Sequence, residues 1–210
     1  MSKPTRITLV RHGEVHNPAG VYYGRLPRFG LSVFGRELAM AAGRQLRYAR
    51  PVALYTSPLL RARQTAALIA AQGLNLKPTM TRLLLEVYSP YDGLTQQVLA
   101  SQNWDLYAGA GPEFEQPGDI LARVLRFFER IRDQYSGRHV VAVTHGDLIA
   151  FSILWAAGLP VTAEGRARLS ECGVIAGYPS LASLTTFAFT PGQERPALNH
   201  RLAIPGKPSL

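Results

Sequence analysis

The 210-residue sequence has little cysteine and no long apolar segment. Its one cysteine, Cys172, excludes an internal disulfide framework and a cysteine-cluster metal site, which agrees with a reducing compartment. The longest apolar stretch, residues 148–161, contains polar and helix-breaking residues and is shorter than the roughly 20 residues of a membrane-spanning helix. The N-terminus lacks the apolar core of a secretory signal. We therefore expect a soluble cytoplasmic protein that does not engage a membrane.

Lysine is also scarce, because only 3 of the 23 basic residues are lysines and the other 20 are arginines. Against 14 acidic residues they give a formal net charge of +9, which predicts an acidic partner, either nucleic acid or a small phosphorylated metabolite. The arginines occur singly or in spaced pairs, such as Arg61 with Arg63, and no three basic residues are consecutive. This scatter disfavours a nucleic-acid groove and favours a small phosphorylated metabolite.

Apolar runs alternate with segments of helical period, and no internal repeat is visible. The pattern predicts strands at 6–10, 52–56, 78–80, 139–144, 172–178 and 182–189, and helices at 32–49, 59–72, 94–106, 118–135 and 147–157. We place helix N-caps at Ser32 and Ser57, with Pro58 in the first helical position, and helix starts near Asp119 and Asp147. Such alternation is typical of an α/β protein, here a three-layer αβα sandwich with a mostly parallel sheet.

Two apolar runs end in the same kind of turn, ITLVRHGE at residues 7–14 and VVAVTHGD at residues 140–147. In a parallel sheet, ligands bind beyond the carboxyl ends of the strands. Arg11 and His12 end the first strand, Arg61 follows the second, and His145 ends a later one. We therefore expect these two imidazoles and two guanidiniums to meet at one edge of the sheet.

This set of side chains suits phosphoryl chemistry, because arginine forks and histidine donors match the charge on phosphoryl oxygens without a metal. Neighbouring positive charge lowers the pKa of an imidazole, so His12 is expected to be neutral and nucleophilic. The leaving alkoxide needs a proton, and Glu86 in LLLEVYSPYDG is the candidate donor.

The segments LVRHGE, SPLLRARQTA, LLLEVYSPYDG, QPGD and VAVTHGD together resemble the histidine phosphatase superfamily, in its phosphoglycerate mutase-like branch 1. The resemblance spans residues 6 to about 189 and keeps the family's motif order. It implies a phosphoglycerate mutase-like fold, a phosphohistidine on His12, and an anion pocket of Arg11, Arg61 and His145 with Glu86 as proton donor. It also implies no metal and no organic cofactor for the phosphatase members.

Further residues are candidates for contact with the substrate. They lie in the loop after the first strand and at the second His-Gly turn: Asn17, Tyr23, Gly24, Arg25 and Gly146. The sequence departs from the family pattern at two points. Asn17 stands six residues after Arg11 instead of seven, and Tyr91–Gly93 replaces a Trp-Glu-Gly segment.

We expect one histidine phosphatase domain over residues 1–190, with a small lid-like insertion at about 94–118 and a C-terminal tail at 191–210. A phosphoglycerate mutase that depends on 2,3-bisphosphoglycerate uses the same nucleophile but must shield the phosphohistidine from water. The short insertion admits water and favours hydrolysis of small phosphomonoesters. We expect the protein to be a monomer or a homodimer. The mutase is the alternative.

Two other readings stay open at this point. His12, Glu14 and His16 form a His-x-Glu-x-His pattern, although a zinc helix uses His-Glu-x-x-His and Pro18 follows here. A non-catalytic phosphopeptide or RNA binder could use the same arginines, although it would need neither His12 nor Glu86. A cysteine phosphatase is excluded, because Tyr178 stands six residues after Cys172 where an arginine is required.

Overall fold

A mixed sheet of six strands forms the centre of the protein. The structure is a computed structural model and describes residues 3–203. In the spatial order β3-β2-β4-β1-β5-β6, the first four strands are parallel, β5 runs antiparallel to β1, and β6 runs antiparallel to β5. The strands are β1 (Thr5–Arg11), β2 (Ala53–Thr56), β3 (Thr79–Met80), β4 (His139–Thr144), β5 (Leu184–Phe189) and β6 (Ala197–Arg201).

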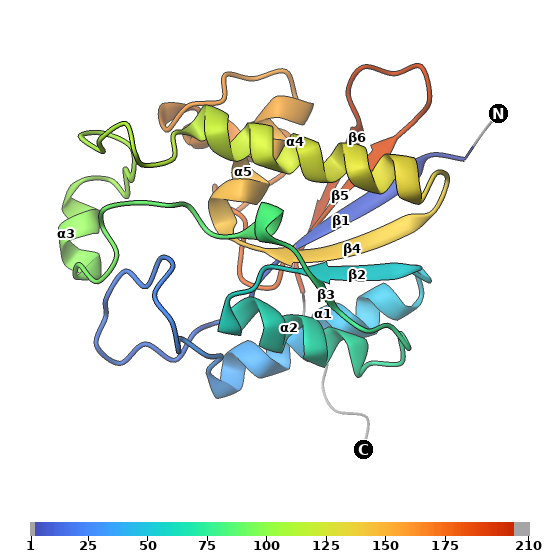
Figure 1. Cartoon of the computed structure of the whole chain (residues 1–210), viewed down its shortest axis with the longest axis horizontal. Helices are drawn as coiled ribbons and strands as arrows, with labels where there is room; N and C mark the ends of the chain where they lie inside the picture. Colours follow the sequence, from blue (N-terminus) through green and yellow to red (C-terminus); the bar gives the residue numbers. More distant parts are fainter. Residues whose placement is uncertain (1–2, 204–210) are drawn as a thin grey trace.

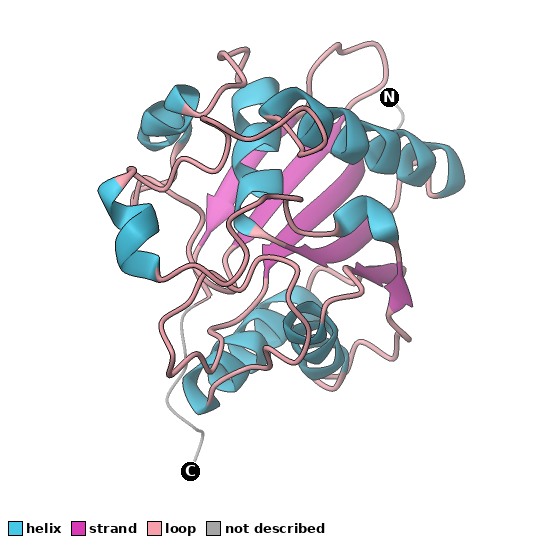
Figure 2. Ribbon diagram, turned by 60° about the vertical axis from the view of Figure 1, so that its left-hand side comes forward, coloured by secondary structure: helices cyan, strands magenta, loops and turns pink. Residues whose placement is uncertain are grey.

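Helices cover both faces of this sheet, so the predicted three-layer αβα sandwich is confirmed (Figures 1 and 2). In Figure 1, α1 (Val33–Arg47) and α2 (Leu60–Ala70) lie below the sheet, and α4 (Pro117–Gln134) and α5 (Gly146–Ala156) lie above it. Shorter helices stand in the connections: η1 (Arg82–Leu84), α3 (Gln96–Ser101) and η2 (Glu164–Cys172).

The central strands are buried on both faces, which is why they read as continuous apolar runs. Along β4, Val140 and Ala142 pack into the core beneath α4 and α5. Val141 and Val143 pack into the second core with α1 and α2. The period of two along one strand thus divides its side chains between two cores.

The parallel strands end level with one another. The backbone N–H of His12 donates to Thr144 O at 3.0 Å, and that of Ser57 donates to Val143 O at 2.9 Å. These bonds extend the ladders of β1, β2 and β4 by one residue, so that His12, Ser57 and His145 follow three adjacent strand ends. On the other side of β1, Ala182 N donates to His12 O at 3.3 Å, which brings the start of β5 to the same edge.

The strand predicted at 172–178 is wrong. Those residues are the end of η2 and a turn in which Gly173 (φ 82°) and Gly177 (φ 70°) adopt the left-handed conformation that interrupts a strand. The helix predicted at 94–106 is reduced to α3, because Asn103 (φ 52°) and Trp104 (φ 56°) are also left-handed.

Two more expectations need correction. Ser57 does not cap α2, which begins at Leu60, and its hydroxyl instead meets His145 Nε2 at 2.8 Å. Within the tail expected at 191–210, Ala197–Arg201 form the edge strand β6, while 204–210 lie outside the described residues. By contrast Ser32 caps α1 as predicted, because its Oγ accepts from Gly35 N at 2.9 Å.

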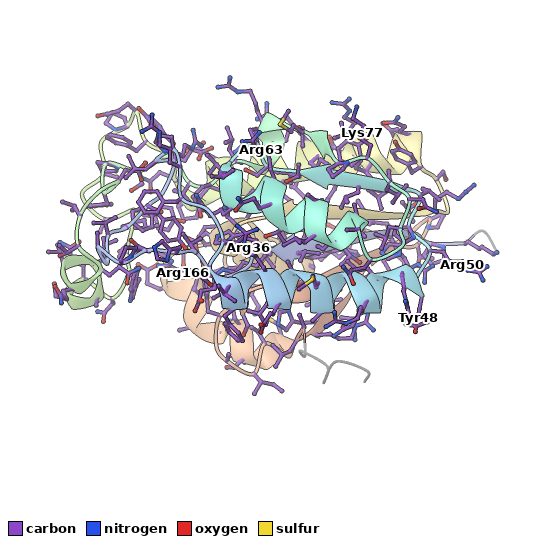
Figure 3. All side chains as sticks on the ribbon, turned by 90° about the horizontal axis from the view of Figure 1, so that it is seen from below. Arg36, Tyr48, Arg50, Arg63, Lys77 and Arg166 are labelled. Carbon is purple, nitrogen blue, oxygen red and sulfur yellow. The ribbon has the colours of Figure 1, made fainter. Side chains whose placement is uncertain are left out.

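The face formed by α1 and α2 carries exposed basic side chains. Figure 3 shows Arg36, Arg50, Arg63 and Lys77 spread along this face instead of gathered at one place. Such a spread offers no concentrated contact for a phosphate backbone on this side of the molecule. Within residues 3–203, no helix combines the length and the apolar character that crossing a bilayer requires.

The loop after β1 is fixed by a close approach to the first turn of α1. A Cβ on Gly13 would collide with the carbonyl oxygen of Gly35, and a Cβ on Gly35 would lie 2.7 Å from Glu14 N. Both neighbours are backbone atoms, which cannot rotate away. Glycine at these two positions therefore lets α1 hold the loop that carries His12.

We predict that Gly35→Ala destabilises the protein by about 1–3 kcal/mol, because the added methyl group must displace backbone. Urea unfolding followed by circular dichroism measures the change. Val33→Ala, two residues earlier and largely exposed, is the matched control and should stay within about 0.5 kcal/mol of wild type. Equal stability of the two variants would show that the close contact between Gly13 and Gly35 does not constrain the loop after β1.

Candidate active site

Four buried side chains from distant segments meet at the carboxyl edge of the sheet: His12, Arg61, Glu86 and His145. The ring centroids of the two histidines are 5.3 Å apart. Glu86 Oε2 lies 3.2 Å from His145 Nδ1 and 3.4 Å from Arg61 Nη2. The structure thus brings together the side chains that the sequence placed at this edge.

His12 presents one ring nitrogen to the site. Its Nδ1 lies 2.8 Å from Gly13 O, and a carbonyl oxygen only accepts, so Nδ1 carries the proton. In the neutral ring this leaves Nε2 unprotonated, with its lone pair available.

The surroundings of His12 favour this neutral form. Burial lowers the pKa of His12 well below its ordinary value, and the positive charges of Arg61 and Arg11 lower it further. The hydrogen bond to Gly13 opposes this shift without reversing it. A neutral imidazole with a free Nε2 is the form in which histidine acts as a nucleophile.

Arg61 enters the site from the first turn of α2 and is fully buried. Its Nη2 donates to Gly24 O at 2.7 Å, and its guanidinium lies 4.6 Å from the centroid of the Tyr23 ring. Arg11 donates to Pro179 O at 2.7 Å from the other side. The Nε atoms of both arginines are buried without a hydrogen-bond partner in the described part of the chain. Buried unpaired donors on two cations are suited to an anion.

His145 stands between Ser57 and Glu86. Burial is the largest cause that lowers the pKa of His145, to about 4, and Arg61 adds to the lowering while Glu86 opposes it. Burial alone would raise the pKa of Glu86, but the hydrogen bond from His145 and the charge of Arg61 bring it below its usual range. In the free protein Glu86 is therefore a carboxylate beside a neutral His145.

Backbone contacts hold Glu86 in place. Arg123, on α4, donates to Leu83 O at 2.9 Å and to Leu85 O at 2.7 Å, just before Glu86. Arg25 Nε donates to Glu86 O at 2.8 Å, and the Glu86 side chain accepts from Val87 N at 3.0 Å. Arg123 was not anticipated from the sequence, because its role is to satisfy carbonyl oxygens far away in the chain.

The candidate substrate-binding residues divide into two groups. Tyr23 and Gly146 line the cavity at the site. Gly24 is buried, and its carbonyl oxygen accepts the hydrogen bond from Arg61. Arg25 forms an ion pair with Glu115 at 2.8 Å. Asn17 bonds to Val21 O at 2.8 Å and to Val21 N at 3.3 Å, and so closes its own loop.

A cavity of about 670 Å³ extends from Arg11 and His12 toward α3 and η2. Its wall includes a group that the sequence did not reveal, centred on Asp147 in the first turn of α5. Asp147 accepts from Tyr107, from Tyr178 at 2.7 Å, and from Arg166 at 3.3 Å. Sequence reasoning assigned Asp147 only to a helix start, and its three partners come from segments without a motif.

The ligands of the His-x-Glu-x-His pattern do not come together as a set. His16 is exposed, and the Glu14 carboxylate accepts from Ser32. Among residues 3–203, the group of potential metal ligands within 4.8 Å of one another is His12, Glu86 and His145. Metal chemistry at this site would therefore have to use the candidate nucleophile as a ligand.

We predict that the protein loses stability as the pH falls from 6.5 toward about 4, since His145 stays neutral when folded and is protonated when unfolded. Urea unfolding at stepped pH measures this slope. In His145→Gln the slope should be shallower by up to about one proton. His16→Gln, which changes an exposed histidine, should keep the wild-type slope. An unchanged slope in His145→Gln would contradict a neutral buried His145.

Comparisons with known proteins agree with this architecture. The sequence profile of the histidine phosphatase superfamily (branch 1) matches residues 7–177. An uncharacterised protein of Mycobacterium tuberculosis is 37% identical over 153 residues, which cover 69% of this chain and 75% of that protein. The metal-independent phosphoserine phosphatase of Arabidopsis thaliana is 32% identical over 171 residues, 70% of this chain and 67% of its own.

Among solved structures, the mycobacterial glucosyl-3-phosphoglycerate phosphatase superposes with a TM-score of 0.74 at 25% identity. The superposition covers 95% of this chain and 98% of that one. The range matched by the family profile, residues 7–177, includes both His-Gly turns, Arg61 and Glu86. The chain therefore belongs to the histidine phosphatase superfamily, branch 1.

Proposed function

We propose that the protein is a phosphatase that hydrolyses small phosphomonoesters through a phosphohistidine on His12, without a metal or organic cofactor. The observation that carries the proposal is the state of His12. Its ring is neutral with Nε2 free, and it lies beside two arginines whose buried Nε donors have no partner within residues 3–203. The names of two relatives, a metal-independent phosphoserine phosphatase and a glucosyl-3-phosphoglycerate phosphatase, support this reaction class. The low cysteine content agrees with a cytoplasmic enzyme.

In the first step the ester phosphate binds between Arg11 and Arg61, whose free Nε groups donate to its oxygens. His12 Nε2 attacks phosphorus, the bond from phosphorus to the ester oxygen breaks, and the alkoxide leaves. The charge of the bound dianion raises the proton affinity of Glu86, which takes up a proton as the substrate binds and gives it to the alkoxide.

In the second step water attacks the phosphohistidine. Glu86, now a carboxylate, accepts a proton from the water, the bond from phosphorus to Nε2 breaks, and inorganic phosphate leaves. His12 returns to its neutral form with Nδ1 still bonded to Gly13 O. Arg11 and Arg61 stabilise the charge on the phosphoryl oxygens in both steps, the part a metal ion plays in other phosphatases.

We predict that His12→Ala lowers phosphate release by about 10⁴-fold or more, because the remaining electrostatics cannot form the covalent intermediate. Release of inorganic phosphate from a panel of sugar phosphates, phosphoglycerates and nucleotides measures it. Quenching the wild-type reaction without acid should trap an acid-labile, base-stable phosphate that is missing from the variant. His16→Ala, in the same loop but exposed, is the matched control. Turnover of His12→Ala at a tenth of wild type would exclude this mechanism.

Two further experiments distinguish the proposed phosphatase from a metallohydrolase and from a phosphoglycerate mutase. A chelator should leave the rate unchanged and vanadate should inhibit, whereas activity lost on chelation and restored by zinc would assign a metal to His12, Glu86 and His145. With 3-phosphoglycerate and catalytic 2,3-bisphosphoglycerate, free phosphate should appear faster than 2-phosphoglycerate. The reverse order would identify a phosphoglycerate mutase.

A further inference from the structure

The side chains that line the cavity fall into two groups. Arg11, His12 and Glu86 belong to the phosphate-binding site, while Tyr22, Trp104, Leu106 and Tyr178 add aromatic and apolar surface to the wall of the outer part. Trp104 is 43% exposed and Leu106 is buried, so the wall runs from the interior to the mouth of the cavity. Aromatic and aliphatic side chains of this kind bind an apolar group because they remove its surface from water.

The charged side chains in this outer part, Arg166, Asp147 and Glu164, give it no net positive charge. Arg166 is paired with Asp147 at 3.3 Å and also donates to Trp104 O at 3.2 Å. Glu164 adds an exposed acidic side chain at the mouth. Among the described residues that line the outer cavity, no cation is left to pair with a second acidic group on a substrate. A carboxylate placed here would lose its water and gain no partner.

The cavity lining also holds a buried neutral donor. The hydroxyl group of Tyr22 is buried without a hydrogen-bond partner within residues 3–203, and Tyr22 lines the cavity. Burial raises the pKa of Tyr22, so the phenol keeps its proton and can donate it to a neutral oxygen of a ligand.

We propose that this outer cavity, given the phosphatase activity proposed above, accepts the leaving group of the ester as an uncharged alcohol bearing an aromatic or other apolar ring. A leaving group with a carboxylate or second phosphate, such as that of phosphoserine or phosphoglycerate, is disfavoured. The preference follows from the aromatic wall, the Asp147–Arg166 pair and the unpaired Tyr22 hydroxyl together.

Calorimetry with two non-hydrolysable phosphonates tests this directly. 2-Phenylethylphosphonate and 3-phosphonopropionate have the same phosphonate and the same two-carbon spacer, but one ends in a phenyl ring and the other in a carboxylate. We expect the wild-type protein to bind the phenyl compound at least about tenfold more tightly. Equal affinity, or preference for the carboxylate, would overturn the proposal.

Three variants test which residues cause the preference for the phenyl compound over the carboxylate. Trp104→Ala removes part of the aromatic wall and should lower the affinity for the phenyl compound about fivefold while leaving that for the carboxylate unchanged. Asp147→Asn frees Arg166 and should shift the ratio toward the carboxylate. Tyr48→Ala is the control, since this exposed ring lies at the opposite end of the molecule from Arg166 (Figure 3) and the ratio should not move. A ratio that stays at the wild-type value in both Trp104→Ala and Asp147→Asn would place the preference elsewhere and contradict the proposed subsite.

Binding is measured without turnover, so the two proposals can fail separately. Absence of phosphate release from every ester would contradict the phosphatase, whereas lack of preference between the two phosphonates would contradict the subsite alone.

Discussion

Arg61 carries a positive charge into the interior, where its side chain is almost completely buried. Its guanidinium joins three segments that are distant in sequence: the loop after β1 through Gly24 O, the residues after η1 through Glu86, and the start of α5 through His145. A buried charge without such partners would be strongly unfavourable, so these contacts constrain all three segments at once. Arg61 thus ties together the segments that carry Gly24, Glu86 and His145.

The same charge sets the protonation of its neighbours. It lowers the pKa of His12 and His145, both of which are already lowered by burial, and it lowers the pKa of Glu86. The site therefore holds two neutral imidazoles and one carboxylate, and the Nε donors of Arg11 and Arg61 have no partner in the described part of the chain. Two guanidiniums beside one carboxylate leave a net positive charge, which suits the phosphate dianion of the substrate that we propose.

Much of this arrangement follows from the sequence. Apolar runs that end in Arg-His-Gly and Thr-His-Gly locate the ends of β1 and β4, and the carboxyl-edge rule for parallel sheets brings His12, Arg61 and His145 together. What the sequence does not reveal is long-range pairing of polar groups without a motif. Ser57 has the local signature of a helix cap, yet its hydroxyl bonds to His145 because β2 ends beside β4.

The sequence-based predictions that are wrong have a related cause, because they too depend on long-range contacts. Residues 172–178 have the composition of a strand, but left-handed glycines at both ends turn the chain, and the vacant edge of β5 is filled by Ala197–Arg201 from the expected tail. The role of Asp147 in the cavity wall depends on its hydrogen bonds with Tyr107, Tyr178 and Arg166. These three residues are distant in sequence, and the fold brings them to Asp147. Local sequence propensity predicts helices and strands, whereas tertiary packing decides which polar side chains become hydrogen-bond partners.

The central claim is that His12 is a neutral imidazole with its proton on Nδ1 and a free Nε2. Nitrogen-15 NMR of the histidine side chains reads this state directly, with His12→Ala used to assign the signal. At pH 7, and still at pH 5.5, the account predicts one protonated nitrogen and one unprotonated nitrogen for His12, with Nδ1 as the protonated one. An imidazolium at pH 7, or a neutral ring with its proton on Nε2, would contradict it.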